Sequence, residues 1–193
     1  MYQSNTPYTS LEEILGLREV RHKVFTSYYH HDDQYYKNYF IENFGHLFID
    51  KSVGEGDINT DVSTEYIKRL IQSENFLRDA SVTVVLCGPN TKKRKHVDWE
   101  IYGTLDSRLD STAGLVGILL PEFPIDINNQ YFYDDLPQRL ADNVKSGFAE
   151  IYRWDYFTSA AENVKQVIKN AFENRTKTNL IKNDRLQMQR NQT

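Results

Sequence analysis

The stretch that decides the fold spans residues 82–101 and reads VTVVLCGPNTKKRKHVDWEI. Its first six residues are apolar almost throughout, which is typical of a parallel strand covered by helices on both faces. Gly88 and Pro89 end this strand, and Thr91 is suited to cap a helix that we expect to run to about Leu109. A strand, a turn and a helix in this order indicate the beginning of a βαβ unit.

The same alternation of strands and helices continues on both sides of this stretch. Further strands are predicted at residues 22–28, 47–49, 115–120 and 149–154. Further helices are predicted at residues 11–20, 34–44, 63–76 and 160–173, the second of them capped by Asp32 and Asp33. We therefore predict an α/β fold with a doubly wound parallel sheet of about five strands in the order 2-1-3-4-5, with helices on both faces.

The chain divides by composition into three parts. Residues 1–21 are expected to form a helical extension, residues 22–175 the α/β domain, and residues 176–193 a polar, frayed tail. Residues 122–146 form an unusually long connection that contains Pro and Asn, and long connections of this kind are often functional.

Composition indicates an ordinary globular protein and excludes several partners. The 193 residues carry a net charge of −4, which argues against a broad nucleic-acid surface. No apolar run is long enough for a membrane span, and residues 1–10 lack the apolar core of a signal peptide. The single cysteine, Cys87, lies in an apolar run and fits a buried thiol in a reducing compartment. We therefore expect a cytoplasmic protein without nucleic-acid or membrane partners.

Several familiar kinds of site are missing from the sequence. Gly54 and Gly56 lack the third glycine of a dinucleotide fingerprint, and no phosphate-binding GxxxxGK[ST] motif is present. The run at 30–33, His-His-Asp-Asp, offers four metal-ligand types, but adjacent loop residues seldom converge on one ion. We expect capping and hydrogen bonding from this run, and no metal.

Glu100 is the candidate catalytic residue. Val97, Ile101 and Leu105 form the buried stripe of the helix that carries it, and at 100° per residue Glu100 lies beside that stripe. A partly buried carboxylate at the carboxyl edge of a sheet is a reasonable catalytic group. The alternative is a solvated glutamate that pairs with one of the lysines at positions 92, 93 and 95.

Four segments resemble TIR-like domains, in particular the group found in the bacterial Thoeris anti-phage defence system. They are VFTSYYHHDD at 24–33, VVLCG with Thr91 at 84–91, VDWEI at 97–101, and LPxRLxDN leading into YxW at 136–154. The resemblance implies a flavodoxin-like sheet and cleavage of NAD+ at the bond between nicotinamide and ribose, with cyclisation of ADP-ribose in some members. Glu100 falls on the catalytic glutamate of this family, whereas His96 stands where many members have Trp.

The chemistry that the resemblance implies suggests roles for further residues. Tyr28 and Tyr29 are expected to stack on the cationic nicotinamide ring. Ser27 and Thr91 are expected to donate hydrogen bonds to ribose or phosphate, with Asp50 at the border of the site. NAD+ is expected as the substrate and no cofactor is expected. The loop at 53–63 is the predicted lid.

Two functions are compatible with the sequence. The first is an NAD+-cleaving enzyme, a glycohydrolase or an ADP-ribose cyclase, that reaches a downstream effector through a diffusible nucleotide. The second is a non-catalytic TIR-like scaffold that signals by oligomerising. The resemblance implies a homo-oligomer in either case.

Overall fold

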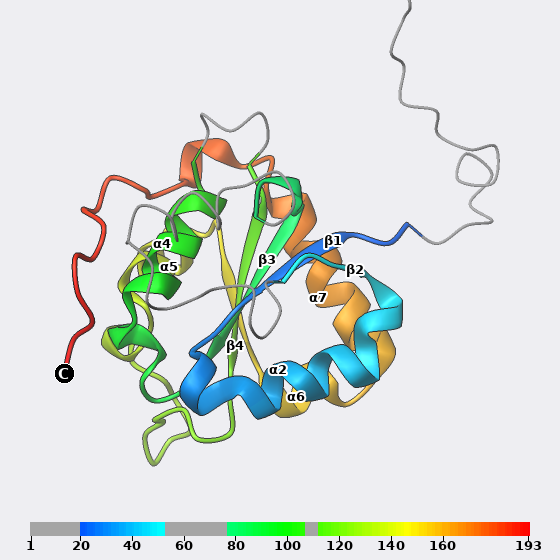
Figure 1. Ribbon diagram of the computed structural model, residues 1–193, viewed down its shortest axis with the longest axis horizontal. Coiled ribbons are helices and arrows are strands. Elements are labelled where there is room, and N and C mark those ends of the chain that lie inside the picture. Colours follow the sequence, from blue (N-terminus) through cyan, green and yellow to red (C-terminus); the bar gives the residue numbers. More distant parts are fainter. Residues whose placement is uncertain (1–19, 53–76, 107–111) are drawn as a thin grey trace, which may run out of the picture.

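The computed structural model describes residues 20–52, 77–106 and 112–193, and its core is one parallel sheet (Figure 1). The sheet has five strands in the order β2-β1-β3-β4-β5, and all four neighbouring pairs are parallel. The predicted sheet and its strand order are confirmed. The strands are β1 (Lys23–Ser27), β2 (Ile49–Asp50), β3 (Val82–Cys87), β4 (Gly114–Leu119) and β5 (Glu150–Arg153).

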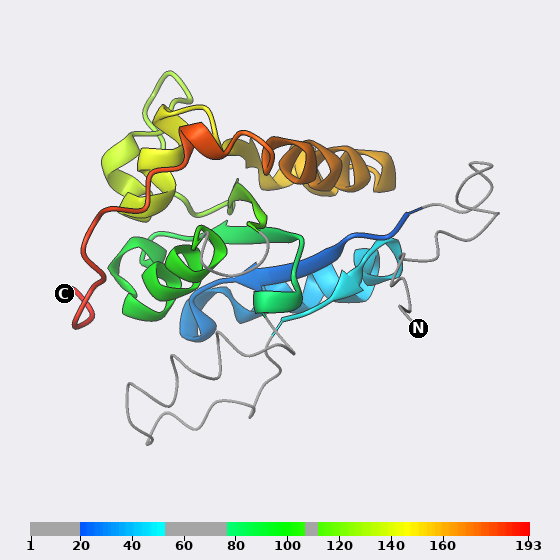
Figure 2. The ribbon, with the colours of Figure 1, turned by 90° about the horizontal axis from the view of Figure 1, so that it is seen from above.

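Helices cover both faces of the sheet, as a doubly wound fold requires. The α-helices are α2 (His30–Phe44), α4 (Lys95–Thr104), α5 (Gln138–Lys145), α6 (Trp154–Thr158) and α7 (Ala161–Asn174). One apolar cluster joins the sheet to α2, α6 and α7, and a second joins it to α4 and α5. In Figures 1 and 2 the layer of α2, α6 and α7 lies to the right of the sheet, and the layer of α4 and α5 lies to the left.

Strand β3 lies at the centre of the sheet, and all six of its residues are buried. Every residue of β3 also pairs with a residue of β4, from Val82 with Gly114 to Cys87 with Leu119. The continuous apolar run therefore predicted both the position and the bounds of this strand.

Several element boundaries differ from the prediction. The helix after β3 is divided, because Arg94 has an extended backbone between the 3₁₀ turn Thr91–Lys93 and α4. Helix α4 ends at Thr104 and not near Leu109. The region predicted as the second strand, 47–49, begins in a 3₁₀ turn, Gly45–Leu47, and the strand follows it. The long connection at 122–146 contains α5.

The predicted cap of α2 by Asp32 and Asp33 is wrong. The helix begins at His30, and the N-terminal capping position, Tyr29, makes no side-chain capping bond. Asp33 is buried, and it accepts a hydrogen bond from Thr91 Oγ1 at 2.9 Å. Asp32 accepts one from Asn90 Nδ2 at 2.9 Å. Both acids therefore tie the first turn of α2 to the loop that follows β3.

The predicted frayed tail is also wrong. Residues 182–193 lie along the outer side of α4 and α5, and both their backbone and side chains form hydrogen bonds with these helices. The polar composition of this segment predicted fraying. Its hydrogen-bond partners lie in distant parts of the chain, and the local composition does not reveal them.

Three predicted elements lie outside the described residues: the N-terminal helix at 11–20 except for its last residue, Val20, the lid at 53–63 and the helix at 63–76. Among the helices that the structure describes, none is long and apolar enough to cross a membrane.

The sheet places a strict demand on Gly114 at the start of β4. A Cβ atom there would lie 1.9 Å from the carbonyl oxygen of Ala171 in α7, and that backbone atom cannot turn aside. We expect Gly114→Ala to lower the free energy of unfolding by about 1–3 kcal/mol or more, because overpacking forces the backbone to shift. Urea unfolding measures the change.

Gly45→Ala is the matched control for this prediction. Gly45 has φ −59° and the nearest atom to its added Cβ would be 3.5 Å away, an ordinary contact. The control should unfold like the wild type. Equal stability of Gly114→Ala and Gly45→Ala would contradict the predicted close packing of α7 on β4.

Candidate active site

A cavity of about 270 Å³ lies at the carboxyl end of β1 and the beginning of α4. Three segments that are distant in the sequence form its walls. They are residues 28–31, which lead from β1 into the first turn of α2, the start of α4 with Arg94, His96, Val97 and Glu100, and Asn191 of the C-terminal segment. The location agrees with the rule that doubly wound sheets bind ligands beyond the carboxyl ends of their strands.

Glu100 lines this cavity and is held there by Ser27, which does not itself line the cavity. Ser27 Oγ donates a hydrogen bond to Glu100 Oε2 at 2.5 Å, across 73 positions of sequence. The exposed fractions of the two residues are only 5% and 1%. Glu100 is therefore buried and turned toward the end of β1, and it is not a glutamate on a solvated face that pairs with lysines.

Burial changes the acidity of Glu100. Removal from water penalises the charged carboxylate and raises the pKa of Glu100 to about 8, while the hydrogen bond from Ser27 opposes this rise. Carboxyl groups with strongly raised pKa values in a cleft are typical of functional sites, because burial of an ionisable group gives no structural benefit of its own. The cavity therefore contains a proton-binding carboxyl group that is poised for ionisation near neutral pH.

Tyr28 and Tyr29 both line the cavity, but their rings already have neighbours. Tyr28 stacks on His30 with ring centres 4.3 Å apart, and its hydroxyl donates to Gln34 Oε1 at 2.9 Å. The Arg94 guanidinium lies 4.0 Å from the centre of the Tyr29 ring. The predicted stacking of these tyrosines on nicotinamide stays a prediction, and Arg94 would compete for one face of Tyr29.

His96 lies one turn before Glu100 on the same helix and also lines the cavity. Its ring packs edge-on against Trp99 at 5.3 Å, and its buried Nε2 has no hydrogen-bond partner among the described residues. Burial lowers the pKa of His96, and the nearby Lys95 and His30 lower it further. The imidazole is therefore neutral at pH 7 and offers one uncommitted nitrogen.

Three predicted site residues do not line this cavity: Ser27, which contacts it only through its hydrogen bond to Glu100, and Thr91 and Asp50. Thr91 Oγ1 accepts a hydrogen bond from the Gly88 N–H at 2.8 Å and donates one to the carboxylate of Asp33. Asp50 is exposed on β2 and accepts from both the N–H and the hydroxyl of Ser52. A direct contact of Ser27, Thr91 or Asp50 with a substrate stays a prediction without support from this geometry.

The run at 30–33 does not gather into a metal site. Asp32 and Asp33 point to partners in the loop after β3, and His30 and His31 stack on tyrosines. Within residues 20–52, 77–106 and 112–193, no three His, Cys, Asp or Glu side chains are grouped as metal ligands would be.

Sequence reasoning missed Arg94 and Asn191 as cavity residues. Arg94 could have been found, because it directly precedes the helix of Glu100. Asn191 carries no local signal, since it lies in a polar segment and reaches the cavity only through the folded structure.

Comparison with known proteins yields one family model and similarity to solved structures. The family model described as Thoeris protein ThsB, TIR-like domain, matches residues 25–123, just over half of the chain. None of the curated proteins matches this chain. The chain is also similar to the TIR domains in "Structure of the activated Roq1 resistosome directly recognizing the pathogen effector XopQ", at 12% identity and a TM-score of 0.39. That similarity covers 83% of this chain and 85% of the other.

The raised pKa of Glu100 predicts a pH-dependent stability. The folded protein holds this proton up to about pH 8, whereas the unfolded chain releases it near pH 4.5. Folding therefore retains a proton between these values, and stability is lost as the pH rises from 4.5 to 8. Glu100→Gln cannot ionise, so we expect it to be more stable than the wild type at pH 8 and to lack this loss.

Urea unfolding of both proteins between pH 5 and pH 8.5 measures the difference. Glu162→Gln, at an 80% exposed side chain on α7, is the control and should keep the wild-type pH dependence. Parallel pH profiles for wild type and Glu100→Gln would show that the carboxyl is not buried as described.

Proposed function

The chain belongs to the TIR-like domain family of the Thoeris protein ThsB, and we propose that it cleaves NAD+ between nicotinamide and ribose, with Glu100 as the catalytic carboxylate. One observation carries this proposal. A buried glutamate, hydrogen-bonded to Ser27, lies in a cavity at the carboxyl edge of the sheet, together with aromatic side chains. No structural requirement of the fold explains a carboxyl group at this position.

The reaction needs a single carboxylate because of the nature of the leaving group. When the C–N bond between ribose and nicotinamide breaks, its electron pair goes to the nicotinamide nitrogen, and the cationic ring leaves as a neutral molecule. Positive charge then develops on the ribose, as it does in glycoside hydrolysis. A carboxylate placed beside the ribose stabilises that charge. No acid is needed to protonate nicotinamide.

The size of the cavity fits one end of a dinucleotide. Sites for small molecules usually enclose about 300–1,000 Å³, and the described walls enclose about 270 Å³. The nicotinamide and its ribose would occupy this space beside Glu100, and the adenosine half would extend beyond it.

Binding of NAD+ should change the ionisation of the Glu100 carboxyl. In the empty cavity its raised pKa keeps much of the carboxyl neutral at pH 7. A cationic nicotinamide ring near the carboxyl would favour the ionised form, because opposite charges lower the pKa of an acid. Binding of NAD+ should therefore release a proton and generate the carboxylate that the reaction uses.

The ribosyl cation has two fates. Water can add to it, which gives ADP-ribose and a proton, or a nitrogen of the adenine in the same molecule can add, which gives cyclic ADP-ribose. We propose that the product is a signal nucleotide in bacterial antiviral defence, made in the cytoplasm by a homo-oligomer and sensed by a separate effector. The family membership supports this role, and the single buried thiol of Cys87 fits a reducing compartment.

Loss of the Glu100 charge should abolish most of the activity. Glu100→Gln keeps the size of the side chain but cannot carry negative charge, so we expect NAD+ turnover to fall by about 100- to 1000-fold. Chromatography of the products formed from NAD+ measures turnover, and circular dichroism verifies that the variant is folded.

Glu162→Gln should turn over NAD+ at the wild-type rate, because the Glu162 side chain is exposed on α7 and, among the described residues, pairs with Lys165. Absence of turnover in the wild type, combined with phage protection that Glu100→Gln leaves intact, would favour the scaffold function instead.

The ionisation of Glu100 also predicts the pH dependence of the reaction. Since kcat/KM reports ionisations of the free enzyme, it should rise with pH up to about 8, the pKa of Glu100. Initial rates at low NAD+ concentration between pH 6 and pH 9 measure this profile. A kcat/KM that falls over this range would assign a protonated group to the rate-determining step and would contradict the role of Glu100 as a carboxylate.

A further inference from the structure

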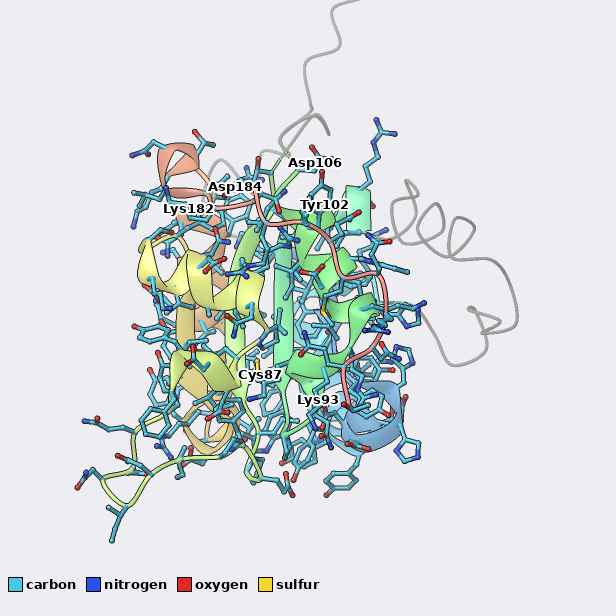
Figure 3. The ribbon with its side chains drawn as sticks, turned by 90° about the vertical axis from the view of Figure 1, so that its left-hand side faces the viewer. Cys87, Lys93, Tyr102, Asp106, Lys182 and Asp184 are labelled. Carbon is cyan, nitrogen blue, oxygen red and sulfur yellow. The ribbon has the colours of Figure 1, made fainter. Side chains whose placement is uncertain are left out.

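The C-terminal segment, residues 182–193, forms a strap across α4. Figure 3 shows it passing from Lys182 and Asp184, beside Tyr102 and Asp106 at one end of the helix, to Lys93 at the other. Because α4 carries Glu100, this strap lies on the element that positions the candidate catalytic residue.

The middle of the strap is fixed by two neighbouring residues of α4. Asp98 accepts a hydrogen bond from the Met188 N–H at 2.8 Å, and Trp99 Nε1 donates one to the Met188 carbonyl oxygen at 2.8 Å. Asp98 is itself bound by the fully buried Arg139 at 3.0 Å. These bonds set the path of the strap along the helix.

The end of the strap is fixed to the first turn of α4. Asn191 Oδ1 accepts a hydrogen bond from the Lys95 N–H at 3.0 Å, and the Gln192 N–H donates to the Lys93 carbonyl oxygen at 2.9 Å. Arg94, the N-terminal capping residue of α4, makes no side-chain capping bond. Asn191 thus supplies a cap from 96 positions away.

The same side chain lines the cavity that contains Glu100. A backbone N–H can only donate, so the atom that faces Lys95 is the amide oxygen, and the Nδ2 group is left on the other side of the carboxamide. Among the described residues, Nδ2 has no hydrogen-bond partner. The cap therefore orients a free donor at the wall of the cavity.

We propose that Asn191 is a substrate-binding residue, whose Nδ2 donates a hydrogen bond to an oxygen of the ribose–phosphate part of NAD+. This inference rests on the proposed function. Arg94 also lines the cavity and adds a positive charge that suits the pyrophosphate. The strap therefore contributes to the affinity for the substrate, whereas Glu100 acts in the chemical step.

Two substitutions separate substrate binding from capping. Asn191→Asp keeps an oxygen that can cap α4, and an acid at this position is favourable near a helix N-terminus. It replaces the Nδ2 donor by a second acceptor. Asn191→Ser keeps a capping hydroxyl without adding charge, but its hydroxyl is too short to cap and also reach a substrate.

We expect both variants to unfold at the wild-type temperature and to have KM values for NAD+ raised about tenfold or more, with kcat changed much less. Loss of one hydrogen bond to a charged group accounts for a change of this size. The rise should be larger for Asn191→Asp, because its carboxylate repels the pyrophosphate. Gln189→Ala is the control, since Gln189 is exposed and, within the part of the chain that the structure describes, its side chain donates to the Gln187 carbonyl oxygen of the strap itself.

The outcomes separate the inference from the proposed function. Wild-type turnover with unchanged KM values in both Asn191 variants would overturn the role of Asn191 and leave the function of Glu100 intact. A KM that rises only in proportion to a lower unfolding temperature would assign Asn191 to capping alone. If the wild type neither turns over nor binds NAD+ in calorimetry, both proposals fail.

Discussion

The buried pair of Arg139 and Asp98 is the interaction on which the site depends. Arg139 is fully buried, and its guanidinium donates to Asp98 on α4 and to the strap residue Asn183. Loss of one member of such a pair costs about 3–5 kcal/mol, because it leaves a buried charge without a partner. The pair therefore fixes α4 against α5 and holds the strap on both. Glu100 lies two residues beyond Asp98, so its position follows from the same constraint.

Helix α4 presents different chemistry on its two sides. On the outer side, Asp98 and Trp99 bind the strap. On the inner side, Glu100 meets Ser27 at the end of β1. Burial of Glu100 without a cationic partner among the described residues opposes folding at neutral pH, since its pKa lies near 8. A group retained against stability in this way is typical of a functional site.

The family segments combine residues of two kinds. Tyr28 and Glu100 line the cavity, and Ser27 holds Glu100 by a hydrogen bond. Thr91, Gly88 and Asp33 instead form a buried network that joins the loop after β3 to α2, and a Cβ on Gly88 would lie 2.3 Å from the carboxylate of Asp33. Part of the shared pattern therefore builds the loop that supports α4. His96 departs from the Trp of many members and leaves a polar nitrogen near Glu100.

The sequence alone determined the sheet and the bounds of β3, and it placed Glu100 beside the buried stripe of its helix while leaving open a solvated glutamate that pairs with lysines. These features depend on neighbours one to four residues apart, and the periods of strands and helices record them directly. The tertiary structure decided the rest. Thr91 donates to Asp33 and does not line the cavity. Asp32 and Asp33 bind the loop after β3 and do not cap their own helix, and the C-terminal segment places Asn191 at the cavity. Each of these contacts joins residues that are 58 or more positions apart. Polar side chains satisfy their hydrogen bonds wherever the fold brings a partner, and no local pattern records which partner that is.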